Sequence, residues 1–228
     1  MHEVFNGPTR IHYEIVGAGA PLLLITGLGS DLRDLRPMIG MLAEDFLVIA
    51  MDNRGAGLSD KPDEAYSMEV MATDAYAVLE DAGIACAAVL GYSMGGRIAL
   101  ELALQHPERV SHLILLGSGA HVIRNLARKA FFTIAPHVPI GPKPRQPIYA
   151  FKRQRTATQE YDGRPYLSRI QMPTLIVHGR SDRIAPPVLA DELHAGIADS
   201  RLEWYAGGHI TPVLRPRVVV DPVRAFLL

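Results

Sequence analysis

The predicted fold depends on one stretch, Val89-Leu90-Gly91-Tyr92-Ser93-Met94-Gly95-Gly96-Arg97-Ile98-Ala99-Leu100. The apolar run at 87–90 predicts a buried strand, and residues 97–105 predict a helix. A chain that turns directly from a strand into a helix leaves little space for side chains beside the turn. Gly91 and Gly95 provide that space, because neither carries a side chain.

The serine between these two glycines is the residue that such a turn exposes. The pattern Gly-x-Ser-x-Gly between a strand and a helix puts the serine hydroxyl on the outer side of a strained turn. The turn also brings the Met94 N–H to the positive end of the helix, where an oxyanion would be stabilised. The pattern also arises by chance in Gly-rich loops, but the strand before it and the helix after it favour Ser93 as a nucleophile.

Length and composition predict one α/β domain of ordinary globular character. The chain has 228 residues, which is enough for a substantial core, and its net charge of −1 indicates no polyanionic partner. We expect a cytoplasmic protein without a membrane span, because no long apolar run and no basic start typical of a signal peptide are present. Cys86 is the one cysteine, so no internal disulfide forms, and we expect its side chain to be buried.

Apolar runs alternate with helical patterns along most of the chain. We expect an edge strand at 11–16, buried strands at 22–25, 47–51, 87–90, 113–117 and 174–178, and a last strand at 202–205. Helical spacing occurs at 31–43, 67–83, 97–105, 186–197 and 218–228. Pro37 is expected near a first turn, and Pro222 either interrupts its helix or marks its first turn. The alternation predicts an α/β fold with a doubly wound, mostly parallel sheet flanked by helices.

The middle of the chain differs from its flanks. Residues 121–171 hold ten Lys and Arg against two acidic residues, a net charge of +8, and several prolines. We therefore predict a core domain formed by 1–120 and 172–228, with 121–171 as a short basic, Pro-rich cap insert. Residues 122–134 could be helical, and irregular structure is expected after Pro136. The positive charge could steer anionic substrates, or it could be a solvated surface or a dimer contact.

Three residues of catalytic type follow predicted parallel strands in the order Ser93, Asp182, His209. A serine hydroxyl needs a base within hydrogen-bond reach, histidine can be that base, and a buried carboxylate can fix its tautomer. Taken singly, Asp182 could cap a helix and His209 could be a loop residue. Their shared place at strand ends and their order favour a catalytic triad. Asp52 and Arg54, in the turn after 47–51, could be catalytic, but they are interpreted as ties within that turn.

Four ordered motifs resemble those of the α/β-hydrolase superfamily, and the resemblance covers nearly the whole chain. They are Leu90–Gly96 at the serine, Asp52-Asn53-Arg54-Gly55-Ala56-Gly57-Leu58-Ser59, Met172–Asp182, and Gly208-His209. The resemblance implies Ser93 as nucleophile, His209 as base and Asp182 as its orienting acid. It also implies an oxyanion hole of the Leu28 and Met94 backbone N–H groups, with Gly27 and Tyr92 beside the substrate.

Within the superfamily, the loop Gly27-Leu28-Gly29-Ser30-Asp31 and the length resemble small carboxylesterases and enol-lactonases. The resemblance implies a serine hydrolase that cleaves a small ester or lactone without a metal or organic cofactor. The same triad could serve C–C bond or thioester hydrolysis or acyl transfer, or the protein could be a slow ligand receptor. An interaction module that works through the basic segment is a further alternative. A homodimer is compatible with the sequence, and nucleic-acid binding is not expected. One departure stands out, since Thr26-Gly27 replaces the family's usual His-Gly.

Overall fold

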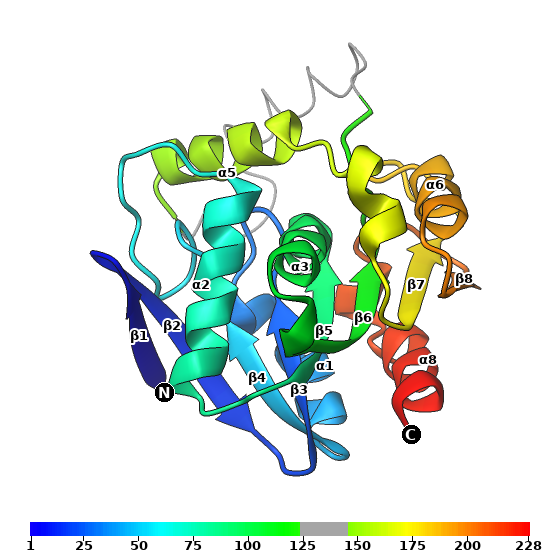
Figure 1. Ribbon diagram of the computed structural model, residues 1–228, viewed down its shortest axis with the longest axis horizontal. Coiled ribbons are helices and arrows are strands. Elements are labelled where there is room, and N and C mark those ends of the chain that lie inside the picture. The colour runs from blue at the N-terminus through cyan, green and yellow to red at the C-terminus, as the bar shows by residue number, and fades with distance from the viewer. Residues whose placement is uncertain (124–145) are drawn as a thin grey trace.

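Eight strands form a single sheet in the computed structural model, which describes residues 1–123 and 146–228 (Figure 1). Their spatial order is β1-β2-β4-β3-β5-β6-β7-β8, in which β3 to β8 are mutually parallel and β2 is antiparallel to both β1 and β4. The strands are β1 (His2–Asn6), β2 (Thr9–Val16), β3 (Ala20–Ile25), β4 (Phe46–Met51), β5 (Ala87–Tyr92), β6 (Val110–Leu116), β7 (Thr174–Gly179) and β8 (Ser200–Tyr205).

Helices cover both faces of the sheet. They are α1 (Leu32–Leu42), α2 (Met68–Asp81), α3 (Met94–Gln105), α5 (Ile148–Glu160), α6 (Val188–Gly196), α7 (Thr211–Leu214) and α8 (Arg217–Leu227), with 3₁₀ turns at Pro107–Arg109 and Arg164–Arg169. Successive strand residues alternate between the faces. Leu23 and Ile25 pack with α2, α3 and α6, whereas Leu22 and Leu24 pack with α1 and α8. The predicted doubly wound, mostly parallel sheet is therefore confirmed.

The N-terminal edge of the sheet differs from the prediction. Residues 11–16 lie in β2, which is covered by β1, so their expected position at the edge was wrong. β1 is mostly exposed and its sequence carries little apolar alternation, which is why the sequence did not reveal it. Asn6 ties this edge to the core, because its amide donates to Thr73 Oγ1 at 2.9 Å and to Asp74 Oδ1 at 2.8 Å.

The positions of two prolines and the exposure of the cysteine also differ from the prediction. Pro37 lies inside α1 and Pro222 inside α8, past the first turn of each helix, and neither interrupts its helix. Pro37 is exposed and Pro222 is partly exposed, so water can replace the lost backbone hydrogen bond. Cys86 is exposed instead of buried. β5 begins at Ala87, directly after the cysteine, and so leaves Cys86 in the preceding bend.

A helix stands where irregular structure was expected after Pro136. α5 begins directly after Pro147, and it crosses above α2 and α3 in Figure 1. The many prolines of the segment hid this helix in the sequence. Its Ala157, together with Tyr161 and Leu167, belongs to the same apolar cluster as α2 and α3. The described part of 121–171 thus shares the main core. The predicted helix at 122–134 lies outside the described residues after Ile123.

Among the described residues, no helix combines the length and the apolar character needed to cross a membrane.

Candidate active site

The turn between β5 and α3 has the close packing that its glycines predict. A Cβ atom on Gly91 would collide with the backbone of Gly95, and one on Gly95 would collide with the backbone oxygens of Ile25 and Thr26. α3 begins at Met94, three residues earlier than expected, so the turn is confined to a single residue.

Ser93 is that residue, and its backbone is strained. With φ 56° and ψ −113°, it is the one non-glycine residue of positive φ in the described part of the chain. Such a conformation costs on the order of 1–3 kcal/mol and persists only where the surroundings hold it. Here the Ser93 N–H donates to the Leu116 oxygen at 2.8 Å, and Ser118 Oγ donates to the Ser93 oxygen at 2.7 Å.

Ser93, His209 and Asp182 form one hydrogen-bonded chain. The separation between Ser93 Oγ and His209 Nε2 is 2.9 Å, and that between His209 Nδ1 and Asp182 Oδ2 is 2.7 Å. A carboxylate can only accept, so His209 Nδ1–H donates to Asp182, and Nε2 is left to accept the serine proton. The structure therefore brings together the three side chains that the sequence singled out, each from a loop that follows a parallel strand.

Asp182 is buried, and both oxygens of its carboxylate are held. Oδ1 accepts the N–H groups of Ile184 at 2.8 Å and Ala185 at 2.7 Å, which leaves Oδ2 for His209. The sequence analysis missed His178, which supports this turn by donating Nε2–H to the Ala185 oxygen at 2.7 Å. Burial lowers the pKa of His178 below its ordinary value, so the ring stays neutral near neutral pH.

Tyr92 fixes the position of His209. Its ring stacks on the imidazole at a centroid distance of 5.4 Å, and its hydroxyl donates to the His209 oxygen at 2.8 Å. Tyr92 and Gly27, both expected beside the substrate, line a hollow of about 340 Å³ that also includes Ser93 and His209. Since the Tyr92 hydroxyl already has an acceptor, positioning of His209 is the role that the contacts support.

The loop after β3 is fixed from two sides. Asn53 Nδ2 donates to the Thr26 backbone oxygen at 2.8 Å and to Thr26 Oγ1 at 3.0 Å. Gly29 N–H donates to Gln154 Oε1 of α5 at 3.1 Å. Thr26, which stands where the family usually has histidine, is therefore anchored by Asn53. Leu28, between these anchors, lines the hollows on both sides of Ser93.

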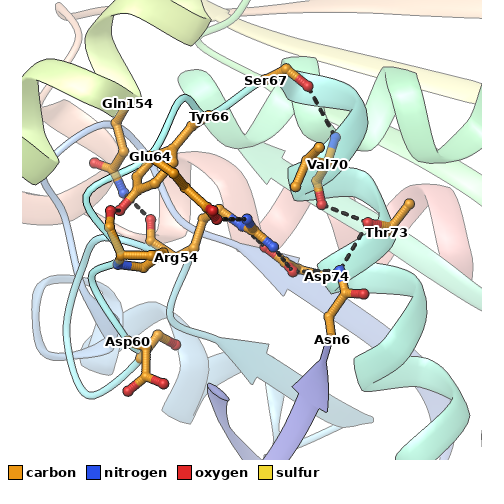
Figure 2. A network of polar contacts seen from close by, with 12 residues as sticks. Asn6, Arg54, Asp60, Glu64, Tyr66, Ser67, Val70, Thr73, Asp74 and Gln154 are labelled. Atoms are coloured by element: carbon orange, nitrogen blue, oxygen red, sulfur yellow. Dashed lines mark hydrogen bonds and ion pairs between the residues drawn. The ribbon is translucent and has the colours of Figure 1, made fainter. Parts of the chain in front are cut away.

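The turn that contains Asp52 and Arg54 is a structural element, as predicted. Asp52 accepts the N–H groups of Leu32 and Leu58, each at 2.9 Å. Figure 2 shows Arg54 joined to Asp74 of α2, with Glu64 at the outer end of the guanidinium. Burial alone would lower the pKa of Arg54, but the hydrogen bonds and charge of Asp74 raise it above its ordinary value.

A second hollow lies on the other side of Ser93, beneath α5. It measures about 220 Å³, and several of its lining residues were not singled out by the sequence analysis, namely Arg97, Phe151, Arg155, Thr158 and Gln159. Only Arg97 offered a signal, because it follows Ser93 by one helical turn. The others lie on α5, which the sequence did not reveal. Among the described residues, no group of three or more His, Cys, Asp or Glu side chains could hold a metal ion.

Comparison with known proteins shows the family to which the chain belongs. A family model described as alpha/beta hydrolase fold matches residues 20–135. A protein from Azorhizobium caulinodans that bears the name carbamate hydrolase RutD is 30% identical, over 99% of this chain and 98% of its own length.

Two solved structures are similar over almost the whole chain. Est816, described as an N-acyl homoserine lactone degrading enzyme, has a TM-score of 0.89 and 26% identity, with 99% of this chain and 100% of that chain covered. The enol-lactonase from Burkholderia xenovorans LB400 has a TM-score of 0.82 and 25% identity, with 96% of each chain covered.

Proposed function

The chain belongs to the α/β-hydrolase family, and we propose that it is a serine hydrolase that cleaves a small carboxylic ester or lactone. The observation that carries the proposal is the hydrogen-bonded chain from Asp182 through His209 to Ser93. The similarity to a lactone-degrading enzyme and an enol-lactonase supports an ester or lactone as the bond that is cleaved.

In the proposed mechanism, Ser93 Oγ attacks the carbonyl carbon while His209 Nε2 takes its proton. The tetrahedral oxyanion accepts from the backbone N–H groups of Leu28 and Met94, each such donor being worth about 3 kcal/mol in the transition state. His209 then protonates the leaving alkoxide. In the second half-reaction His209 activates a water molecule against the acyl-enzyme, and Ser93 is released with the free acid.

The same three residues would also act on other acyl groups. A carbamate is one such group, and the relative named carbamate hydrolase makes it the second substrate class to test. Thioester or C–C bond cleavage, acyl transfer and a slow receptor function remain alternatives that share Ser93. An interaction module would differ from all of these, because it would not depend on the serine.

The test is hydrolysis of p-nitrophenyl esters of increasing acyl length by the wild type and by Ser93→Ala. Lactone and carbamate substrates are followed in parallel by titration of released acid. We expect loss of about 10³-fold or more in kcat on removal of the nucleophile. Ser111→Ala is the matched control, because Ser111 is exposed on β6 and should leave the rate unchanged. Equal activity of Ser93→Ala and the wild type would overturn the proposal.

A further inference from the structure

The hollow beneath α5 combines apolar walls with two guanidinium groups. Its apolar lining includes Leu28, Met94, Phe151, Ile184, Ala185 and Leu189. Arg97 and Arg155 line the same space as Ser93 and His209, and no Asp or Glu belongs to the described residues that line it. A hollow with this lining matches a ligand that has an apolar body and one negatively charged end.

Arg97 is built into the floor of this hollow. It lies in the first turn of α3 after Ser93 and is 5% exposed. Its Nη2 donates to the His121 backbone oxygen at 2.8 Å, which orients the guanidinium. Arginine stays protonated at neutral pH, so the positive charge is present in the hollow.

Arg155 comes from the opposite wall. Phe151, Arg155, Thr158 and Gln159 follow helical spacing, so this face of α5 is the one that covers the hollow. Arg153 lies on a different face, where its side chain is 43% exposed and Nη2 is 3.1 Å from Asp63 Oδ1. One arginine of α5 therefore lines the hollow that contains Ser93, and its near neighbour lies at the surface.

We infer that Arg97 and Arg155 bind a carboxylate at the far end of the substrate's acyl group. A guanidinium presents paired N–H donors that match the two oxygens of a carboxylate. The acyl group is placed in this hollow because α5 covers it, whereas the hollow on the other side includes the exposed Ile210 and offers the leaving alcohol a way out. The substrate class is then a half-ester of a dicarboxylic acid or a lactone that carries a carboxylate, and this inference rests on the proposed hydrolase function.

The test compares monoethyl glutarate with ethyl valerate, which have the same acyl chain length and differ in the terminal carboxylate. Released acid is titrated, and kcat/KM is determined for both esters. Hydrogen bonds to charged groups are stronger than those between neutral groups, so the wild type should favour the charged ester by roughly 10- to 100-fold. Arg155→Met should abolish most of that preference, and Arg155→Lys should retain part of it, because lysine keeps the charge without the paired donors.

Two further variants separate specific binding from folding and from overall charge. Arg97→Lys is the second variant, since it keeps a cation at a buried position where a neutral side chain could prevent folding. Arg153→Met removes the same charge from the outer side of α5 and should keep the preference. A wild type that cleaves both esters equally would overturn the inference, as would an equal loss of preference in Arg153→Met and Arg155→Met.

Failure of this inference can be told apart from failure of the proposed function. A fluorophosphonate that labels the wild type but not Ser93→Ala supports the hydrolase function whatever the ester preference is. Labelling without a preference for the charged ester overturns only the carboxylate site. If labelling and hydrolysis both fail, calorimetric titration with glutarate decides: binding by the wild type that Arg155→Met loses supports the site, and equal binding by both overturns it.

Discussion

Gln154 accepts the backbone N–H of Gly29 at 3.1 Å, across 125 residues of sequence. Its amide also donates to the Arg54 backbone oxygen at 2.8 Å, and the side chain is fully buried. One glutamine of α5 therefore holds both the loop that carries Leu28 and the turn that carries Arg54. In the proposed mechanism, Gln154 would position the Leu28 N–H without contact to the substrate.

Replacement of Gln154 separates these two contacts. Gln154→Leu removes both and should lower the free energy of unfolding by about 1–3 kcal/mol, because the backbone oxygen of the buried Arg54 loses this hydrogen bond. Gln154→Glu keeps an acceptor for Gly29 but turns a carboxylate oxygen toward the Arg54 backbone oxygen in place of the donor. If Gln154 positions the oxyanion loop, kcat should fall more than KM rises in Gln154→Leu, and Gln154→Glu should recover part of kcat. A loss of stability without any change in kcat would show a merely structural role.

The Asp182 carboxylate should be needed for its charge and not for its shape. In Asp182→Asn, Oδ1 can still accept from Ile184 and Ala185, but the amide nitrogen cannot accept from His209 Nδ1–H. The imidazole is then held in the wrong tautomer, and we expect kcat to fall by about 10⁴-fold with little change in the thermal midpoint. Asp191→Asn, on the exposed side of α6, is the control. A fall of less than tenfold in Asp182→Asn would contradict the assignment.

The two acidic partners of Arg54 should differ greatly in their effect on stability. Asp74 is buried and accepts from Arg54 Nε at 2.5 Å and from Nη2 at 2.6 Å (Figure 2). The Glu64 side chain is 54% exposed, and its Oε1 lies 3.4 Å from Arg54 Nη1. Removal of one partner of a buried pair costs about 3–5 kcal/mol, because the other charge stays buried without compensation. Urea unfolding should show this loss for Asp74→Ala and less than about 1 kcal/mol for Glu64→Ala. Similar losses in both variants would argue against a buried ion pair.

His178 should make the fold sensitive to acid. Burial lowers its folded-state pKa, whereas the unfolded chain has an ordinary histidine with a pKa of about 6.5. As pH falls below about 6.5, the unfolded chain binds a proton that the folded protein does not take up until lower pH. The contribution to stability is therefore full above about pH 6.5 and is lost as pH falls toward the folded-state pKa.

Unfolding in urea at about pH 7.5 and about pH 5.5 tests this pH dependence. His178→Gln should lose less stability than the wild type on acidification. His194→Gln, at an exposed position of α6, should behave as the wild type does. An unchanged pH dependence in His178→Gln would assign the acid sensitivity to other groups.

Local patterns predicted the parts of the site that lie where strands end. Ser93, Asp182 and His209 each follow an apolar run that could be read directly, and chain order joined them into one prediction. The support around them could not be read in this way. Gln154 and Arg155 lie on a helix preceded by many prolines, and their contacts reach residues far away in sequence. His178 belongs to a run that predicts only a strand, and its hydrogen bond to Ala185 depends on a turn that no local pattern specifies.

The positive φ of Ser93 places the proposed nucleophile in conflict with the stability of the whole chain. Glycine adopts that conformation at little cost, whereas alanine keeps the Cβ atom and with it the strain. Ser93→Gly should therefore melt at a higher temperature than both the wild type and Ser93→Ala, although both variants lack the nucleophilic hydroxyl. Serine at this position is therefore an activity–stability trade-off. Glycine would give a more stable fold, but the protein would lose the proposed nucleophile.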